Sequence, residues 1–235
     1  MIYIKNVKKY LHRVFLWSRG RDLFEKLDIS LEYKMFGGNY GGWPVINSFI
    51  DKDSVVYSVG VGTDITFDMD LINKYKVRLH AFDPTPEAIE YVENNNIPVE
   101  NFIMHGYGLY KNDEMIKFYK PKNENYVSHS IYDKGGKKEF YVEMKRLQTI
   151  MSELNHEHID LLKMDIEGAE YDVISDMMES GILPDQLLIE FHHRFENIKP
   201  AKTRESIELL RSFGYLLFYI SDSGTDYGFV RSSLV

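Results

Sequence analysis

The chain carries the stretch VVYSVGVGTD at residues 55–64, a short run rich in β-branched residues that ends in two glycines. This composition predicts a buried strand over Val55–Val59, followed by a tight turn. The next window, Thr66–Tyr75, has helical periodicity, and Val77–Phe82 predicts a second strand. A strand, a glycine turn, a helix and a second strand make up the unit from which parallel α/β sheets are built.

The alternation of strands and helices continues along most of the remaining chain. Three more strands are predicted, at Val99–Met104, Ile159–Met164 and Gln186–Phe191. Three more helices are predicted, one that Pro86 opens and that ends before Asn94, and two at Tyr171–Glu179 and Thr203–Phe213. Strands that alternate with helices of about ten residues pair in parallel through right-handed crossovers. The predicted fold class is therefore α/β, with a doubly wound, mostly parallel sheet.

The C-terminal residues break this alternation. Tyr215–Ile220 and Tyr227–Arg231 are apolar runs on either side of the turn-rich segment 221–226, a pattern that predicts an antiparallel hairpin. With this hairpin the predicted sheet has seven strands. A parallel sheet that ends in an antiparallel hairpin is similar to the Rossmann-like architecture of class I methyltransferases, whereas nucleotide dehydrogenases usually end in a parallel strand.

Length and composition are typical of one packed domain with an N-terminal extension. The chain has 235 residues, of which 44% are hydrophobic. We divide it into an extension over residues 1–50, which holds a basic helix and a Gly/aromatic loop, and a domain over residues 51–235. A segment at about residues 111–141, rich in Lys, Asn, Tyr and Gly, is predicted to be a long insertion with some short strands.

The absence of cysteine and of long apolar runs restricts the cellular setting. Without cysteine there are no disulfides and no thiolate metal sites, which fits a reducing compartment. No run approaches the roughly 18 to 20 apolar residues that span a bilayer, and a signal-peptide pattern is missing. We therefore expect a cytoplasmic protein, and the sequence leaves open whether it forms a homo-oligomer.

Charge is distributed unevenly along the chain. The net charge is −8, but Met1–Lys26 holds seven Lys or Arg against two acids, a local balance of +5, so the remainder carries −13. A body this acidic repels phosphate backbones, and no nucleic acid is expected as a partner. The window Val7–Trp17 predicts a helix with an apolar face and a basic face. Such a helix packs on the domain as a cap, the favoured interpretation, or makes peripheral contact with an anionic membrane or a partner.

Two features that follow the first and second predicted strands together indicate a cofactor site. Gly60 and Gly62 leave room for a cofactor to approach the backbone, where exposed N–H groups can meet its polar groups. Asp83, about 20 residues further on, is placed to accept hydrogen bonds from both ribose hydroxyls of an adenosine. The dinucleotide fingerprint needs a third small residue where this chain has Ile65. S-adenosylmethionine is therefore the expected cofactor, and a NAD-dependent oxidoreductase remains the alternative.

The stretch LLKMDIEGAE at residues 161–170 ends a predicted strand in several carboxylates. It resembles the signature of the FkbM-type methyltransferases, and FDPTP at 82–86 and LIEFH at 188–192 are similar to the pattern of the same family. The resemblance covers about residues 55–231. It implies a class I methyltransferase fold and methyl transfer from S-adenosylmethionine to an oxygen, commonly in sugars, glycolipids or polyketide-type natural products. A small-molecule or glycan acceptor is the partner that this resemblance implies.

The resemblance also implies which residues contact the cofactor. The family typically has Asp-x-Gly-Ala-Asn-x-Gly in the first motif, and here Ser58 stands in place of the first acid. We hypothesise that Asp64 partly takes over the role of that acid in holding the cofactor's ammonium. Asp165 is expected close to the transferred methyl group. The expected cofactor-binding residues are Ser58, Gly60, Gly62, Asp64, Asp83, Pro84, Gly106 and Asp165.

Transfer to a hydroxyl requires alignment of the acceptor and removal of its proton. Candidate general bases at the predicted sheet edge are Asp165, Glu190, His192 and His193. We favour His192 as the base and Asp165 as an orienting group, and Glu190, two residues before His192, shares its face if the strand extends that far. Asp165, Glu190 and His192 could instead hold a divalent cation, an alternative that we do not favour.

The segment before the core, residues 36–44, combines several glycines with Tyr40 and Trp43. It could close over the active site and stack these aromatic rings on a sugar face, with His193 as a further substrate contact. A glycine-rich connector with buried aromatic residues is the alternative. A third functional class, a noncatalytic domain that binds S-adenosylmethionine, also remains open.

Overall fold

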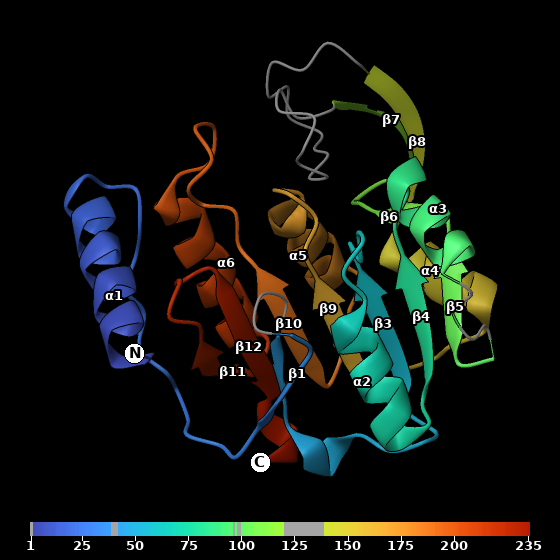
Figure 1. Cartoon of the computed structure of the whole chain (residues 1–235), viewed down its shortest axis with the longest axis horizontal. Helices are drawn as coiled ribbons and strands as arrows, with labels where there is room; N and C mark the ends of the chain where they lie inside the picture. The colour runs from blue at the N-terminus through green and yellow to red at the C-terminus, as the bar shows by residue number, and fades with distance from the viewer. Residues whose placement is uncertain (1, 39–41, 96, 98–99, 120–138) are drawn as a thin grey trace.

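The computed structural model describes residues 2–38, 42–95, 97, 100–119 and 139–235. A seven-stranded sheet forms its centre (Figure 1). The strands of this sheet are β3 (Val55–Val59), β4 (Arg78–Phe82), β5 (Phe102–His105), β9 (Leu161–Met164), β10 (Gln186–Glu190), β11 (Tyr215–Ile220) and β12 (Asp226–Arg231). Their order across the sheet is β11–β12–β10–β9–β3–β4–β5. The predicted seven-stranded α/β sheet is confirmed.

Pairing in the central sheet is parallel except around β12. β3 pairs in parallel with β4 and with β9, and β10 pairs in parallel with β9. β12 runs antiparallel to both of its neighbours, β10 and β11. The predicted C-terminal hairpin is therefore confirmed, with its last strand inside the sheet. The strand order reverses between β3 and β9, and open α/β sheets bind ligands beyond the carboxyl ends of the strands at such a switch point.

Helices cover both faces of the sheet, as a doubly wound fold requires. They are α2 (Thr66–Tyr75), α3 (Pro86–Asn94), α4 (Leu147–Leu154), α5 (Glu170–Glu179) and α6 (Pro200–Ser212). The helices α4, α5 and α6 pack on the face that carries Tyr57 and Leu162, whereas α2 packs on the face that carries Val56 and Leu161. Successive residues of a strand point to opposite faces, which explains this division. The short helix α4 is missing from the sequence-based prediction.

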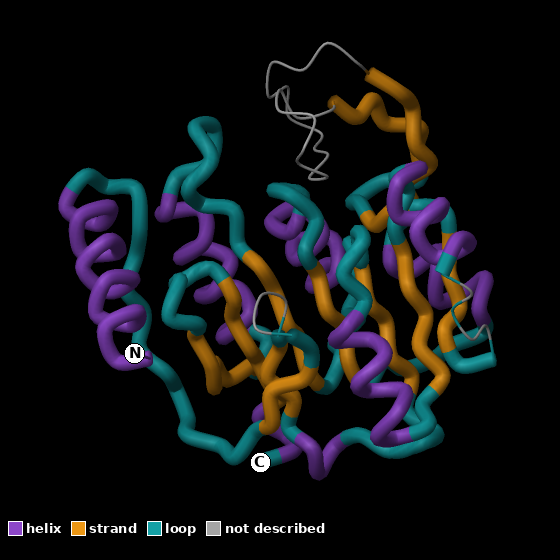
Figure 2. The backbone as a smooth tube through the Cα atoms, viewed as in Figure 1, coloured by secondary structure: helices purple, strands orange, loops and turns teal. Residues whose placement is uncertain are grey.

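The predicted insertion folds as part of a second, smaller sheet. Its strands are β6 (Gly108–Leu109), β7 (Glu114–Tyr119) and β8 (Glu139–Lys145), in the order β6–β8–β7. β7 and β8 pair antiparallel and rise beyond the carboxyl edge of the central sheet, at the top of Figures 1 and 2. The part of the insertion between them, residues 120–138, lies outside the described residues.

The N-terminal extension begins with α1 (Ile2–Ser18), which stands at one end of the molecule in Figure 1. The chain joins the hydrophobic core at Leu23, which is buried. An antiparallel ribbon of β1 (Lys34–Phe36) and β2 (Trp43–Val45) flanks the predicted Gly/aromatic loop, of which residues 39–41 lie outside the described residues. Two short 3-10 helices are η1 (Asn47–Phe49) and η2 (Ser232–Leu234). None of the helices in the described part of the chain is long and apolar enough to cross a membrane.

A cluster on one face of the sheet joins Tyr57 of β3, His80 of β4, His105 of β5 and His156. His80 Nδ1 lies 3.0 Å from His105 Nε2, and the Tyr57 hydroxyl lies 2.8 Å from His156 Nδ1. The rings of His80 and His156 are edge to face, with their centroids 5.0 Å apart. Burial lowers the pKa of all three histidines, that of His80 to about 4. The three imidazoles are therefore neutral in the folded protein at neutral pH.

We expect the histidine cluster to destabilise the fold as the pH falls from about 6.5 towards 4. An unfolded histidine takes up a proton near pH 6.5, whereas folded His80 takes one up only near pH 4. The unfolded state thus binds more protons in this interval, and the free energy of unfolding falls by up to about 3 kcal/mol on account of His80. Thermal unfolding of the wild type and His80→Gln at a series of pH values measures this effect. The variant should lose less stability in acid than the wild type, and an equally steep loss contradicts the prediction.

Candidate active site

A cavity of about 460 Å³ opens at the carboxyl ends of β3, β4, β9 and β10, at the switch point of the sheet. Most residues of the predicted cofactor and catalytic sets meet there, although they come from distant parts of the chain. Those that line the cavity are Gly60, Gly62, Asp64, Asp83, Pro84, Asp165, Glu190 and His192. The insertion also reaches the cavity, because Phe118 of β7 and Met144 of β8 line it.

The turn after β3 requires a glycine at position 60. Gly60 has a φ of +74°, in the left-handed region, and a Cβ there would lie 1.7 Å from the carbonyl oxygen of Asp165. Two hydrogen bonds hold this turn. The Gly60 N–H donates to the Phe82 carbonyl at 2.8 Å, and the Lys163 ammonium donates to the Gly60 carbonyl at 2.8 Å. The turn is therefore tied to both neighbouring strands, β4 and β9, while it lines the cavity.

Asp83 is buried at the end of β4 and joins the two predicted cofactor motifs. Its Oδ2 accepts a hydrogen bond from the Gly62 N–H at 2.9 Å. Its Oδ1 accepts hydrogen bonds from the Thr85 N–H at 2.9 Å and from the Thr85 hydroxyl at 2.6 Å. Since a carboxylate offers about four acceptor sites, about one remains for a ligand. That leaves room for one ribose hydroxyl, where the sequence suggested contacts to both.

Asp64 lines the cavity at the start of α2. Its Oδ1 accepts hydrogen bonds from the Thr66 N–H at 3.1 Å and from the Thr66 hydroxyl at 2.7 Å. These contacts tie the carboxylate to the first turn of the helix, where a negative charge is favourable. The role of Asp64 in holding the cofactor's ammonium stays a hypothesis, and it now has a second, local role in starting α2.

His192 forms a pair with a carboxylate that the sequence analysis did not select. Its Nδ1 lies 2.8 Å from Glu170 Oε1, and that oxygen also accepts hydrogen bonds from the Ile166 and Gly168 N–H groups at 3.1 Å. Glu170 Oε1 is therefore the acceptor in all three of these hydrogen bonds, so His192 Nδ1 carries a proton and donates it. The only signal for Glu170 in the sequence was its place in the LLKMDIEGAE motif. Its contact with His192 depends on the fold.

The other nitrogen of His192 is surrounded by carboxylates. His192 Nε2 lies 3.7 Å from Asp165 Oδ1 and 3.7 Å from Glu167 Oε2. Burial by itself would lower the pKa of His192, but Glu170, Asp165 and Glu167 outweigh burial and raise that pKa to about 10. Burial, reinforced by Asp165, raises the pKa of Glu190 to about 8. At neutral pH the cluster therefore holds an imidazolium and a protonated Glu190.

The same cluster offers a place for a cation. The ligand atoms of Asp165, Glu190 and His192 all lie within 4.8 Å of one another. Two carboxylate oxygens and an imidazole nitrogen at this spacing could hold a divalent metal. Glu170, on His192 Nδ1, would then orient the imidazole, as a second carboxylate does in many metal sites. The predicted metal alternative thus has a geometry that an experiment can test.

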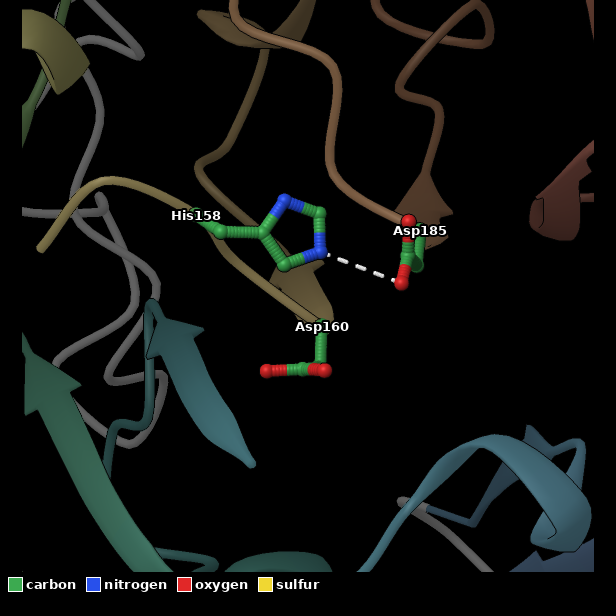
Figure 3. Close-up of side chains that lie close together, drawn as sticks. All are labelled: His158, Asp160 and Asp185. Carbon is green, nitrogen blue, oxygen red and sulfur yellow. Dashed lines mark ion pairs between the residues drawn. The ribbon is translucent and has the colours of Figure 1, made fainter. Parts of the chain in front are cut away.

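A second His/Asp cluster lies at the opposite edge of the sheet, where β9 and β10 begin. His158 Nε2 lies 3.1 Å from Asp185 Oδ2, and Asp160 lies beside this pair (Figure 3). Asp160 Oδ2 accepts a hydrogen bond from the Val55 N–H at 2.7 Å. These contacts hold the starts of neighbouring strands together. The cluster is remote from the cavity, and we assign it no part in the function proposed below.

Two predicted substrate residues have structural contacts instead. His193 is buried, and its Nε2 lies 3.4 Å from Asp22 Oδ1. His192 lines the cavity, whereas His193, in the turn that begins after it, is buried against Asp22 outside the cavity. Trp43 is buried in β2, where the Lys163 ammonium lies 5.5 Å from its ring centroid. The predicted substrate contacts of His193 and Trp43 are therefore not supported.

Two predicted cofactor residues also lie elsewhere. Ser58 is fully buried inside β3, below the glycine turn. Gly106 packs against Ile89 of α3, and among the described residues it is Gly108 that lines the cavity. The chain after β5 thus reaches the cavity two residues later than expected. Tyr40, the third predicted substrate residue, lies outside the described residues.

The fold and the site together define a class of protein. A doubly wound sheet of seven strands, with an antiparallel strand inserted near one end and a glycine turn and an acid at the ends of its first two strands, is the architecture of class I methyltransferases. A family model described as "Methyltransferase FkbM domain" matches residues 54–217. The chain therefore belongs to the FkbM methyltransferase family, which confirms the resemblance that its motifs show.

Curated relatives and solved structures are similar at low identity. The human "Probable methyltransferase-like protein 24" is 22% identical over 160 residues, which cover 67% of this chain and 37% of that protein. The rat protein of the same name is 23% identical over 159 residues, which cover 66% and 38%. This chain thus spans less than two fifths of the length of these relatives.

Among solved structures, a methyltransferase FkbM from Methylobacillus flagellatus KT is 12% identical, with a TM-score of 0.48, over 77% of this chain and 44% of that chain. A fibrillarin pre-rRNA processing protein from Methanococcus jannaschii is 11% identical, with a TM-score of 0.49, over 80% of this chain and 70% of that chain.

Proposed function

We propose that the chain is an S-adenosylmethionine-dependent O-methyltransferase that acts on a hydroxyl of a small-molecule or glycan acceptor. The observation that carries this proposal is one cavity, lined by Gly60 and Gly62, by Asp83 and by His192 with its carboxylates. Membership of the FkbM family supports methyl transfer. When bound, the cofactor supplies an electrophilic methyl group on a positively charged sulfur. The protein has to bind that cofactor, orient the acceptor and remove a proton.

The residues present fit this cofactor. The backbone at Gly60 is bare of any side chain, and the remaining acceptor site of Asp83 suits a ribose hydroxyl. Asp165 and Glu167 line another part of the same cavity and bring negative charge that complements a sulfonium and an ammonium. We therefore assign the adenosine to the ends of β3 and β4, and the sulfonium to the side of the cavity at the ends of β9 and β10.

His192 is the proposed general base. Its Nε2 faces Asp165 and Glu167 in the cavity wall, while Glu170 holds the Nδ1–H. Its pKa of about 10 keeps it protonated at neutral pH in the absence of a ligand. His192 loses this proton more readily once a positive charge occupies the same cavity, since like charges disfavour the imidazolium. Neutral Nε2 would then accept the proton of the acceptor hydroxyl, with Glu170 still holding the Nδ1–H.

The remaining wall of the cavity suits an acceptor with both hydroxyl groups and apolar faces. Leu109, Phe118 and Met144 contribute apolar surface, and Glu167 and Glu190 contribute hydrogen-bonding groups. A sugar or a related natural product has this combination of surfaces. The charge of −13 on the body speaks against a nucleic acid acceptor. A cytoplasmic location stays a prediction.

Calorimetry with S-adenosylmethionine and with NAD tests the cofactor assignment. We expect S-adenosylmethionine to bind and NAD to show no binding. We expect Asp83→Ala to weaken S-adenosylmethionine binding about 10-fold to 100-fold, because a hydrogen bond to a charged group contributes about 1.5 to 3 kcal/mol. Asp53→Ala, at an exposed carboxylate outside the cavity, is the matched control and should bind as the wild type does. Binding of NAD alone would favour the oxidoreductase, and binding of neither ligand would rule out our proposal.

Transfer of a labelled methyl group to a panel of sugars and other hydroxyl compounds identifies the acceptor class. The same assay with and without EDTA tests the metal alternative at Asp165, Glu190 and His192. With His192 as the base, we expect the rate to be unchanged by EDTA. If EDTA abolishes activity and added Mn²⁺ or Mg²⁺ restores it, a bound cation and not His192 activates the hydroxyl. Cofactor binding without transfer to any acceptor would favour a noncatalytic domain.

A further inference from the structure

Helix α1 exposes a row of apolar side chains. Val7, Leu11 and Phe15 follow one another at four-residue intervals, so they lie on one face of the helix. Their exposed fractions are 45%, 60% and 51%. They belong to the apolar face that the sequence predicts, and in Figure 1 α1 lies at one end of the molecule, away from β3 and β4. Large apolar side chains in a row at the surface are typical of an interaction site.

The opposite side of α1 is attached to the body. The Arg13 guanidinium is buried, donates to the Leu23 carbonyl at 2.9 Å and lies 4.5 Å from the centroid of the Phe24 ring. The rings of Tyr10 and Trp17 also lie near Phe24, with centroids 6.0 and 6.4 Å from its own. The helix is therefore a cap on the domain, as the favoured interpretation holds. It packs through Arg13, whereas Tyr10 and Trp17 are 58% and 55% exposed and extend the apolar surface beyond the row.

The exposed side of α1 is positively charged. Lys8 and Arg19 are exposed, and the Arg19 guanidinium lies 4.5 Å from the centroid of the Phe15 ring. Residues 1–21 contain no Asp or Glu. The apolar row is thus accompanied by cations and by no acid of its own helix. This combination of Phe and Leu with Lys and Arg is typical of helices that lie in the interface of an anionic bilayer.

The acids that follow α1 in the sequence are paired with arginines, one of α1 itself and the others of the body. Asp22 forms ion pairs with Arg13 and Arg194. Glu25 Oε1 lies 2.8 Å from Arg204 Nε. These pairs reduce the negative charge next to the helix, whereas the charge on the rest of the body is −13. An anionic surface therefore attracts this end of the molecule and repels the remainder, which defines one orientation of approach.

We propose that α1 binds an anionic lipid surface, with Val7, Leu11 and Phe15 buried among the acyl chains and with Lys8 and Arg19 at the lipid phosphates. The apolar row supplies burial, and the basic residues supply attraction, at about 1 kcal/mol for each Lys or Arg near an anionic surface. This contact is independent of the cavity, and it would hold a methyltransferase at a membrane.

Sedimentation with vesicles tests this proposal on the full chain. We expect binding to vesicles that contain about a third phosphatidylserine, binding at least about 10-fold weaker to pure phosphatidylcholine, and release by high salt. The double variant Leu11→Asp/Phe15→Asp should lose at least about 10-fold in affinity for the anionic vesicles. Lys8→Gln/Arg19→Gln should lose most of the preference for anionic over neutral vesicles. Met115→Asp, at an apolar side chain that is 59% exposed on β7, is the matched control and should bind as the wild type does.

The competing occupant of the row is a second copy of this chain. Size-exclusion chromatography with light scattering measures the oligomeric state of the wild type and of Leu11→Asp/Phe15→Asp. The proposal is overturned if the wild type is a dimer and the variant is a monomer. It is also overturned if the wild type does not bind anionic vesicles. Calorimetry with S-adenosylmethionine on the same samples separates the two proposals, because the substituted side chains do not line the cavity. Loss of vesicle binding with cofactor binding intact concerns α1 alone and supports the proposal.

Discussion

Gly60→Ala is expected to abolish cofactor binding and to destabilise the whole domain. The φ of +74° costs about 1 to 2 kcal/mol for any residue with a Cβ. The added Cβ would also lie 1.7 Å from the carbonyl oxygen of Asp165 and 2.8 Å from its carbonyl carbon. Both atoms are backbone at the end of β9, so no side-chain rotation relieves the clash. The ends of β3 and β9 have to separate, and the total cost is about 3 to 5 kcal/mol.

Thermal unfolding and calorimetry with S-adenosylmethionine measure the two effects of Gly60→Ala. Gly20→Ala is the matched control, because Gly20 has a φ of +66° but no atom within 4 Å of its added Cβ. This control isolates the cost of the left-handed backbone, and it should keep cofactor binding. Wild-type stability and affinity in Gly60→Ala would show that the turn is neither strained by a side chain nor part of the cofactor site.

His192→Ala is expected to lower kcat about 100-fold to 10,000-fold, the usual contribution of a general base. Affinity for S-adenosylmethionine should stay within about 10-fold of the wild type, because the imidazole acts on the acceptor proton. Glu170→Gln is the conservative companion, since its amide oxygen can still accept the hydrogen bonds from the Ile166 and Gly168 N–H groups. Its kcat should fall less than that of His192→Ala. A His192→Ala variant with wild-type kcat would assign the proton to another group.

The pH dependence of the rate supplies a second readout for His192. Its pKa of about 10 in the unliganded protein means that the neutral, basic form grows with rising pH. We expect kcat/KM for the acceptor to rise with pH, and the rise to occur at lower pH when the cofactor is saturating. Glu170→Gln should move the rise further down, because Glu170 is the largest source of the raised pKa of His192. His192→Ala should remove this pH dependence.

The same pairing affects stability in the opposite direction to the His80 cluster. Burial opposes the charge on His192, but Glu170 and its neighbours raise the pKa from 6.5 to about 10. A raised histidine pKa stabilises the fold fully below pH 6.5, and this stabilisation is lost as the pH rises towards 10. For these two histidines alone, both contributions are complete near pH 6.5, with the His80 contribution lost below that pH and the His192 contribution lost above it.

Local patterns in the sequence predicted most of the helices and strands and part of the candidate site. The run at Val55–Val59, the glycines after it and Asp83 follow from β-branched composition, turn chemistry and spacing, which act over a few residues. The strand end near Asp165 follows from the pattern of the predicted strand, whereas β10 ends at Glu190, so it is the loop after the strand and not strand periodicity that brings His192 to the same cavity. The compositional and strand patterns depend on near neighbours in the chain, so no knowledge of the packing was needed for them.

Tertiary structure decided which of these elements meet. Several features depend on residues that are far apart in the chain or on neighbouring elements. They are the insertion of β12 between β10 and β11, the pairing of Glu170 with His192, the burial of His193 against Asp22 and the outward face of α1. Such contacts are selected by the packing of the whole domain, in which each strand excludes water from the next and each buried charge needs a partner. A sequence pattern specifies which face of an element is apolar, and only the assembled core specifies what that face touches.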